Sequence, residues 1–368
     1  MRSKLFLIVG ILMIASMIVT ACATPEAPTP ETITIIETVE VEIEGETVIQ
    51  EVERVVTATP APEAPVEAVE FKSADPTQWV YVTFGDIDTL DTGFMYDSAS
   101  GDAVINIYDF LAYWDGNAAG EFVPMLAESW DITDDGATYT FHIREGVQFH
   151  DGSILVPSDV AYTFTRNLLQ GGTSSPQMML TEPILGVGVM DITEMVDAEN
   201  PPYDDAETLA AYPEEDIVAA CELVQSKIVA DNDAMTVTFH LEQGWGAFIA
   251  TLSGYWGSVR SEAWTKANGG WDGDCTTWPN YYGFQSDTLN GLGVGNDAMG
   301  TGPYMLDHWT PTEGYVLVSN ENYWPTEPLF EGRPVGAPSL KTVVVMLADE
   351  FNTRWAMQQA GDADQIVP

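Results

Sequence analysis

Alternation of apolar and polar residues is clearest between residues 128 and 143. In the segment 138–143 every second residue is apolar, which is the pattern of a strand with one buried face. The segment 128–133 also favours a strand, and the Asp134-Asp135-Gly136 sequence between the two is a turn signal. We therefore predict an antiparallel hairpin in this part of the chain.

A helix is predicted soon after this hairpin. Ser158 is a residue type that caps helices, Val160, Phe164 and Leu168 recur at helical spacing, and two glycines at 171–172 end the pattern. The chain then carries more polar and proline-containing segments before the next regular pattern begins.

The first pattern returns further along the chain. Residues 235–241 alternate as residues 138–143 do, and the polar triplet 231–233 stands where the first turn stood. Residues 214–225 precede this repeat and have a helical apolar face that includes Cys221. We therefore predict two similar hairpins built on one edge of a sheet.

The first 22 residues have the layout of a secretory signal. Arg2 and Lys4 precede an apolar run over residues 5–19, which is shorter than a membrane span requires. The run ends in Val-Thr-Ala-Cys at 19–22, which resembles the bacterial lipobox and implies acylation of Cys22 after cleavage. A signal-anchor helix with an incidental cysteine is the alternative. We expect a lipid-anchored protein on the extracytoplasmic face of the cell membrane.

Residues 23–74 are predicted to form an extracytoplasmic stalk. The segments 24–30 and 58–65 are rich in Pro, Ala, Thr and Glu, so they cannot form a packed core. The segment 31–57 between them has β-type alternation in parts, with Gly45 near its centre. Two interpretations stay open: an extended acidic spacer, or a small element that pairs with a partner or with itself.

The charge of the chain limits the classes of partner. Only 12 Lys and Arg residues are present, and the formal net charge is −45. Such a field repels nucleic acid and anionic lipid, so we expect direct binding to neither. The charge is explained either by solubility or by attraction of cationic solutes. The 45% hydrophobic content is ample for a core, and 368 residues suit one large domain or two.

Three motifs together resemble the extracytoplasmic solute-binding proteins of peptide and nickel ABC importers, the oligopeptide/dipeptide-binding family 5. The first spans residues 126–166 and includes LAESW, DDG, YTF and FHDG. The second is GTGPY at 300–304 with Asn and Tyr-Trp at 320–324, and the third runs from Arg354 to Asp364. The resemblance covers residues 79–368.

The resemblance implies an α/β protein of the two-lobed periplasmic-binding-protein type II fold, with only the first lobe and the hinge crossing present. It implies capture of peptides or similar small solutes and their delivery to ABC permease subunits, by a monomer that closes about a hinge. We expect a signal peptide with lipobox at 1–22, the stalk at 23–74, solute-binding lobe I at 75–346, and the start of a truncated lobe II at 347–368. Within lobe I we expect a core sheet subdomain, 75–100 plus 296–346, and an inserted subdomain, 101–295.

The expected ligand-binding residues come from two segments. In the family the first strand of the lobe and the turn after it open onto the ligand cleft, and here Asp91-Thr92 replaces the usual Asp-Pro. Aspartates in this turn would meet a ligand ammonium group. Residues 245–282 are dense in aromatics, the side chains that binding pockets favour. The predicted set is Phe84, Gly85, Asp86, Asp88, Asp91, Trp245, Tyr255 and Trp256.

The sequence carries no recognisable pattern of catalytic or metal-binding residues. Of the four histidines, His142 and His240 occupy matching polar positions of the two hairpins, and His150 lies in a turn. The sequence holds no metal-ligand histidine spacing and no nucleophile elbow, and the glycines at 291–295 do not follow a strand. We therefore expect no enzyme activity, no cofactor and no metal site.

Cys221 and Cys275 remain after Cys22 is acylated, and in an exported protein we expect them to pair as a disulfide. The alternative function is a surface adhesion or scaffold lipoprotein that derives from the same family and no longer transports.

Overall fold

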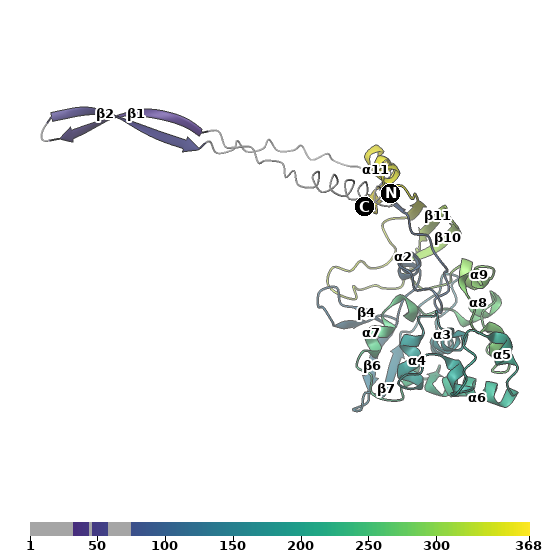
Figure 1. Ribbon diagram of the computed structural model, residues 1–368. Helices are drawn as coiled ribbons and strands as arrows, with labels where there is room; N and C mark the ends of the chain where they lie inside the picture. Colours follow the sequence, from purple (N-terminus) through teal and green to yellow (C-terminus); the bar gives the residue numbers. More distant parts are fainter. Residues whose placement is uncertain (1–31, 44–45, 58–74) are drawn as a thin grey trace, which may run out of the picture. The chain divides into compact units, whose positions relative to one another are not determined.

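The computed structural model describes residues 32–43, 46–57 and 75–368. The chain divides into two compact units, Met1–Glu70 and Phe71–Pro368, which are described separately (Figure 1). The predicted signal sequence and Cys22 lie outside the described residues. None of the helices in the described ranges has the length and apolar character needed to cross a membrane.

The first unit contains one antiparallel hairpin. Strand β1 (Thr32–Ile43) pairs with β2 (Glu46–Thr57) along its whole length. Thr32 lies opposite Thr57 at one end, and Ile43 lies opposite Glu46 at the other. For residues 31–57 we left open an extended spacer or a small pairing element. In the structure the two strands of this segment pair with each other.

The second unit contains a five-stranded sheet built from both of its ends. The strands are β3 (Gln78–Thr83), β10 (Tyr304–Thr310), β11 (Gly314–Ser319), β12 (Thr342–Leu347) and β13 (Gln365–Ile366). Their order is β10-β11-β12-β3-β13. The pairs β10–β11 and β11–β12 are antiparallel, and β3 runs parallel to both of its neighbours, β12 and β13.

The last residues of the chain complete this sheet. Strand β12 leads through helix α11 (Phe351–Ala360) to β13, which pairs with β3 on its other side, with Gln365 opposite Tyr81. The Asp364 carboxylate also accepts a hydrogen bond of 2.8 Å from the Val80 N–H. We expected residues 347–368 to start a second lobe, whereas in the structure a parallel crossover returns this segment to the first sheet. A helical pattern alone cannot show which sheet the next strand joins.

The middle of the chain forms a four-stranded antiparallel sheet. It contains β6 (Ala127–Ile132), β7 (Thr138–Ile143), β9 (Thr236–His240) and β8 (Ile228–Asp231), in that order. Both predicted hairpins are present, and they meet where β7 pairs with β9. Helices α3 (Pro157–Gln170) and α6 (Glu214–Lys227) pack against this sheet.

Helix α3 begins two residues earlier than predicted, with Val156 and not Ser158 at the cap position. Pro157 is its first residue and Val156 precedes it, so Ser158 lies inside the helix and does not cap it. The Asp159 carboxylate accepts a hydrogen bond of 2.9 Å from the Val156 N–H, which satisfies a group at the helix start. The Asp159 carboxylate in the first turn therefore accepts a hydrogen bond at the helix start, the role that we predicted for the Ser158 hydroxyl.

Two large buried clusters form most of the core of the second unit, and a small third one contains Phe94, Leu289 and Val294. One surrounds Phe141, Phe164 and Phe239 between the four-stranded sheet and its helices. The other lies between the five-stranded sheet and helix α2 (Ser98–Ile107), and includes Val104 and Leu317. Cys221 of α6 is bonded to Cys275, with Cα atoms 5.5 Å apart, so the disulfide ties the first cluster to the loops that cover it.

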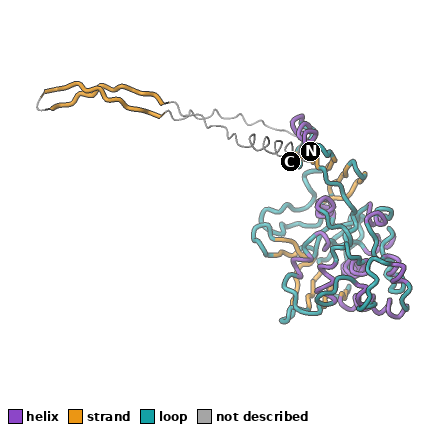
Figure 2. Tube along the Cα trace, in the orientation of Figure 1, coloured by secondary structure: helices purple, strands orange, loops and turns teal. Residues whose placement is uncertain are grey.

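Short elements and loops make up the rest of the unit (Figure 2). They are α2 (Ser98–Ile107), β4 (Ala112–Trp114), β5 (Phe122–Pro124), α4 (Met178–Leu185), η1 (Ile192–Met195), α5 (Ala206–Ala210), α7 (Phe248–Leu252), η2 (Tyr255–Gly257), α8 (Glu262–Ala267), η3 (Trp278–Tyr281), α9 (Ser286–Leu289) and α10 (Gly293–Asn296).

Candidate functional site

The carboxyl ends of three parallel strands define a candidate site. Strands β12, β3 and β13 end at Leu347, Thr83 and Ile366, and parallel pairing brings these ends to one edge of the sheet. In open α/β sheets, ligands bind outside the carboxyl ends of the strands. We call the surface at this edge the strand-end face; it comprises residues 84–88, Tyr96, the start of α2, η2 and the start of α11.

Exposed aromatic side chains gather at the β3 and α11 part of the strand-end face. Phe84, directly after β3, is 58% exposed, and Phe351 and Trp355 of α11 are 46% and 47% exposed. The Phe351 and Trp355 rings stack with centroids 6.3 Å apart. Globular proteins seldom leave so many large apolar side chains together in solvent, so this part of the face is a candidate for binding.

Arg354 joins these aromatics without offering a free charge. Its guanidinium lies 5.3 Å from the Phe84 ring centre and 5.9 Å from that of Phe351. Its nitrogens donate hydrogen bonds to the carbonyls of Val367, Ala348 and Asp349. The side chain is buried, so Arg354 holds the chain ends after β12 and β13 in place and supports the aromatic rings.

A second aromatic group lies at the start of α2. The Trp256 ring of η2 lies 5.9 Å from Tyr96 and 5.5 Å from Tyr255, between ring centres. Tyr255 packs directly on Gly101 of α2, where an added Cβ would come within 2.9 Å of the ring. The glycine therefore permits η2 to approach the helix.

The first turn of α2 connects this second group to the end of β3. A Cβ on Gly85 would lie 3.4 Å from that of Ala99, and the Asp88 N–H donates to the Ser100 hydroxyl over 2.9 Å. Asp97 caps the helix by accepting a hydrogen bond of 2.8 Å from the Ser100 N–H. Phe84 and Trp256 thus belong to one continuous stretch of surface.

The predicted aspartates have three different environments. Asp88 is exposed on the strand-end face. Asp86 accepts hydrogen bonds from the Trp309 indole, 3.1 Å, and from the Thr312 N–H, 2.6 Å, so it fastens the chain after β3 to the β10–β11 turn. Of the predicted aspartates, Asp88 is therefore the one that presents an exposed carboxylate on this face.

The structure is at odds with the expectation that Asp91 meets a ligand. Its side chain is fully buried, and its carboxylate forms ion pairs with Arg166 and, over 3.5 Å, with Arg260. Burial alone would raise the pKa of Asp91, but the two guanidinium charges outweigh it and hold that pKa below its usual range. Asp91 is a core residue because both of its oxygens are already used.

Trp245 also lies away from the strand-end face. Its N–H donates to the Gly136 carbonyl over 3.3 Å, and its own carbonyl accepts from the Tyr139 hydroxyl over 3.0 Å. These contacts place it beside the β6–β7 turn, against the cluster around Phe141. The face therefore brings together Phe84, Gly85, Asp86, Asp88, Tyr255 and Trp256, and leaves out Asp91 and Trp245.

Sequence reasoning missed three aromatics of the strand-end face. Phe351 and Trp355 are four residues apart and share a helix face, a spacing that points to a common surface when polar residues surround it. Tyr96 precedes the capping residue Asp97, and that position gave no signal of its own. In the described part of the chain, no group of three or more His, Cys, Asp or Glu residues is placed to hold a metal ion.

The chain is similar to known proteins over most of its length. Residues 121–368 match the family described as bacterial extracellular solute-binding proteins, family 5 Middle. The chain is 25% identical over 285 residues to heme-binding protein A of Haemophilus influenzae, covering 75% of this chain and 40% of the relative. It is 24% identical over 287 residues to the dipeptide-binding protein of Escherichia coli, covering 75% and 41%. The chain thus spans about 40% of the length of these curated relatives.

Solved structures share the fold. The substrate-binding domain of an oligopeptide ABC transporter from Bacillus anthracis superposes with a TM-score of 0.51 at 19% identity, covering 80% of this chain and 45% of that one. A substrate-binding protein from Microbacterium hydrocarbonoxydans, complexed with 4-hydroxybenzoate hydrazide, gives a TM-score of 0.52 at 21% identity, covering 78% and 46%. The predicted fold class, the α/β fold of type II periplasmic binding proteins with part of its two lobes, is confirmed. The chain belongs to the bacterial extracellular solute-binding proteins of family 5.

Proposed function

We propose that this chain is the substrate-binding component of an ABC importer, and that its strand-end face contacts the solute. The observation that carries the proposal is the exposed aromatic surface at the carboxyl ends of β12, β3 and β13. Family membership supports a solute-binding role, and relatives are named for dipeptides and heme. The solutes are peptides or similar small molecules, captured outside the membrane and delivered to permease subunits.

The chemistry of the face suits such solutes. Aromatic rings supply a large contact area with few freely rotating bonds, and they accept many different side chains. The exposed carboxylate of Asp88 is placed to meet a ligand ammonium group. Among the described residues of the face, the one arginine is Arg354, and its guanidinium already donates to backbone carbonyl oxygens. A solute would be held against the face when the two lobes of a family protein close over it.

We also propose an anchored, monomeric protein. Acylation of Cys22 would hold it at the extracytoplasmic face of the membrane, with residues 23–74 as a stalk that includes the β1–β2 hairpin. Residues 75–368 would form lobe I, with a core sheet subdomain and an inserted subdomain at 101–295. A Cys22→Ser variant should move from the membrane fraction to the soluble extracytoplasmic fraction; retention at the membrane would contradict the anchor.

Indole NMR tests the solute-binding face even where affinity is weak. The chain has 11 tryptophans, and ¹⁵N-indole labelling gives each one a separate N–H signal. A pool of di- and tripeptides at millimolar concentration should shift the signals of Trp256 and Trp355 and leave that of the fully buried Trp278 in place. Assignment by single Trp→Phe variants identifies each signal.

A pair of variants makes the test local. Phe84→Ala should weaken the response of Trp355 about tenfold or more, because it removes the exposed ring that packs on the Arg354 guanidinium beside Phe351. Trp114→Ala removes a ring of similar exposure that packs on Phe122, outside the face, and should change nothing. If no solute shifts Trp256 or Trp355, or if both variants act alike, the proposed site is wrong.

A further inference from the structure

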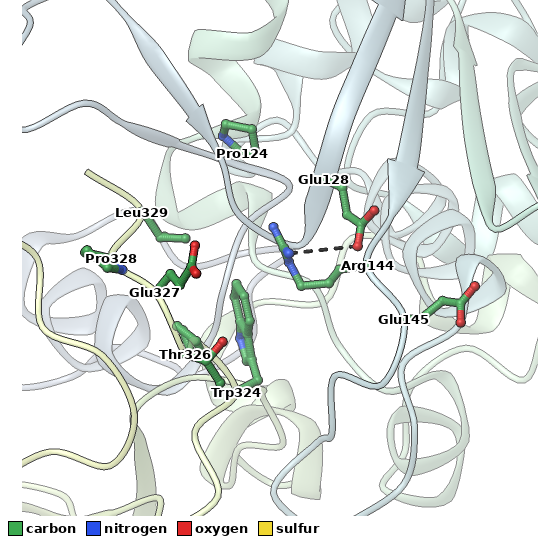
Figure 3. Close-up of a pocket in the computed structure, with 10 residues that line it drawn as sticks. Pro124, Glu128, Arg144, Glu145, Trp324, Thr326, Glu327, Pro328 and Leu329 are labelled. Atoms are coloured by element: carbon green, nitrogen blue, oxygen red, sulfur yellow. Dashed lines mark ion pairs between the residues drawn. The ribbon is translucent and has the colours of Figure 1, made fainter. Parts of the chain in front are cut away.

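A groove of about 490 Å³ lies outside the strand-end face (Figure 3). Its walls come from the end of β5, from β6, from the two residues after β7, and from the segment that follows Tyr323. The lining residues are Pro124, Glu128, Arg144, Glu145, Trp324 and the segment 325–329. The solute-binding proposal makes no use of any of these residues.

The aromatic residue of the groove is held rigidly. The Trp324 indole donates a hydrogen bond of 2.7 Å to the buried carboxylate of Asp109. Asp109 also accepts from the Thr301 hydroxyl, 2.9 Å, and from the Tyr323 hydroxyl, 3.2 Å, so it fixes the chain on both sides of the β10–β11 pair. A ring fixed in this way loses little conformational entropy when another molecule packs against it.

The single cation of the groove is already committed. The Arg144 guanidinium lies 4.9 Å from the Trp324 ring centre, and its Nε donates to the Met125 carbonyl over 3.1 Å. Its Nη1 lies 3.8 Å from the Glu128 carboxylate, the contact that Figure 3 marks with a dashed line. Arg144 therefore completes the wall beside Trp324 and is not a site for an incoming anion.

The remaining charges of the groove are negative. Glu145 and Glu327 are exposed, and neither forms an ion pair or side-chain hydrogen bond with the described residues. Against one arginine, the three glutamates leave a formal excess of two negative charges. The net charge of −45 extends this field beyond the groove and draws cations toward it.

We propose that this groove docks a basic polypeptide segment of a partner protein. An arginine or lysine side chain meets the exposed carboxylates that line the groove, Glu145 and Glu327, and the residues on either side of it cover Pro124, Pro328 and Leu329. A free small cation would leave these apolar side chains uncovered, whereas an extended chain buries them. The volume of about 490 Å³ lies within the range of ligand pockets and exceeds one side chain.

Binding to the groove is tested with a labelled arginine peptide and an uncharged control peptide of otherwise identical sequence. Fluorescence anisotropy with acetyl-Ala-Pro-Arg-Pro-Ala-amide, carrying a dye, is compared at low salt with the same peptide in which citrulline replaces arginine. The full chain should bind the arginine peptide about tenfold more tightly, and the difference should shrink as salt is added. Equal binding of the two peptides would overturn the proposal.

Charge-matched variants separate the groove from the general field. Glu145→Gln with Glu327→Gln should bring the arginine peptide down to the level of the citrulline peptide. Glu199→Gln with Glu222→Gln removes two exposed carboxylates elsewhere, with the same change of net charge, and should have little effect. Equal weakening by both pairs would show attraction to the whole surface, and N-acetylarginine amide binding as tightly as the peptide would show a small-cation site; either result overturns the docking proposal.

Discussion

Asp91 Oδ1 lies 2.6 Å from Arg166 Nη1, and both side chains are buried. Arg260 approaches the same carboxylate to 3.5 Å and donates from Nη2 to the Val294 carbonyl over 3.1 Å. The three charged residues come from the turn after β3, from α3 and from the segment before α8. The ion pair therefore fastens the five-stranded sheet to the helical part that follows it in sequence.

Removing the carboxylate from this cluster should destabilise the protein strongly. Asp91→Asn leaves two buried guanidinium groups without a counter-charge, and breaking a buried pair in this way costs about 3–5 kcal/mol. Urea unfolding followed by tryptophan fluorescence measures the loss. Asp88→Asn changes an exposed carboxylate three residues away and should stay within about 0.5 kcal/mol of the wild type. A loss below about 1 kcal/mol for Asp91→Asn would contradict a structural role.

Gly302 of the GTGPY motif is required by close packing. Its N–H donates to the Ile107 carbonyl over 2.9 Å, and a Cβ on Gly302 would come within 2.6 Å of that carbonyl. Gly302→Ala should therefore lower the free energy of unfolding by about 1–3 kcal/mol, since the end of α2 must move. Gly246 has no atom within 4 Å of an added Cβ, so Gly246→Ala should be neutral or stabilising by up to about 1 kcal/mol. Thermal unfolding of the two variants, measured in parallel, tests this difference. An equal loss of unfolding free energy in both variants would argue against close packing at Gly302 as the cause.

Local patterns predicted the elements, and long-range partners explain the errors. The β6–β7 hairpin and α3 follow from periodicities that lie within a few residues. We predicted Asp91 to be a ligand-binding residue because its partner, Arg166, is 75 positions away in sequence, and no residue close to Asp91 in sequence indicates this ion pair. Strand β13 has only two residues, so its membership of the first sheet depends on β3 and not on its own pattern.

The candidate site was predicted in part for the same reason. Phe84 was found through the strand that precedes it, and Tyr255 and Trp256 through the density of aromatics around them. That density could not separate Trp256, which meets Tyr96, from Trp245, which meets the β6–β7 turn. Only the packing of η2 on Gly101 brings one tryptophan to the strand-end face and leaves the other elsewhere.

The disulfide between Cys221 and Cys275 should contribute substantially to stability. It closes a loop with a sequence separation of 54, and in the chain-entropy description such a loop stabilises by about 4 kcal/mol. The Cys221→Ser and Cys275→Ser double variant should lose a comparable amount in urea unfolding. Reductant should weaken the wild type by a similar amount and leave the double variant unchanged. If reductant has no effect on the wild type, the two cysteines are not paired in the protein.

His150 should make the protein less stable at mildly acidic pH. Its Nε2 lies 3.1 Å from the Gly302 carbonyl, which a neutral imidazole can satisfy by donating from Nε2. Its Nδ1 is buried and has no hydrogen-bond partner among the described residues, so a second proton would have no acceptor there. Burial lowers the pKa of His150 from 6.5 to about 4.

The direction of the pH effect follows from that lowered pKa. Between about pH 6.5 and pH 4 the unfolded chain binds a proton at His150 that the folded chain does not, so acidification favours unfolding. The stabilising contribution is complete above pH 6.5 and falls by up to about 3 kcal/mol as the pH approaches 4. His150→Gln should therefore show a shallower decline of unfolding free energy across this range than the wild type. His308→Gln, which removes an exposed imidazole on β10, serves as the control. Parallel curves for the wild type and His150→Gln would show that this histidine does not titrate between the two states.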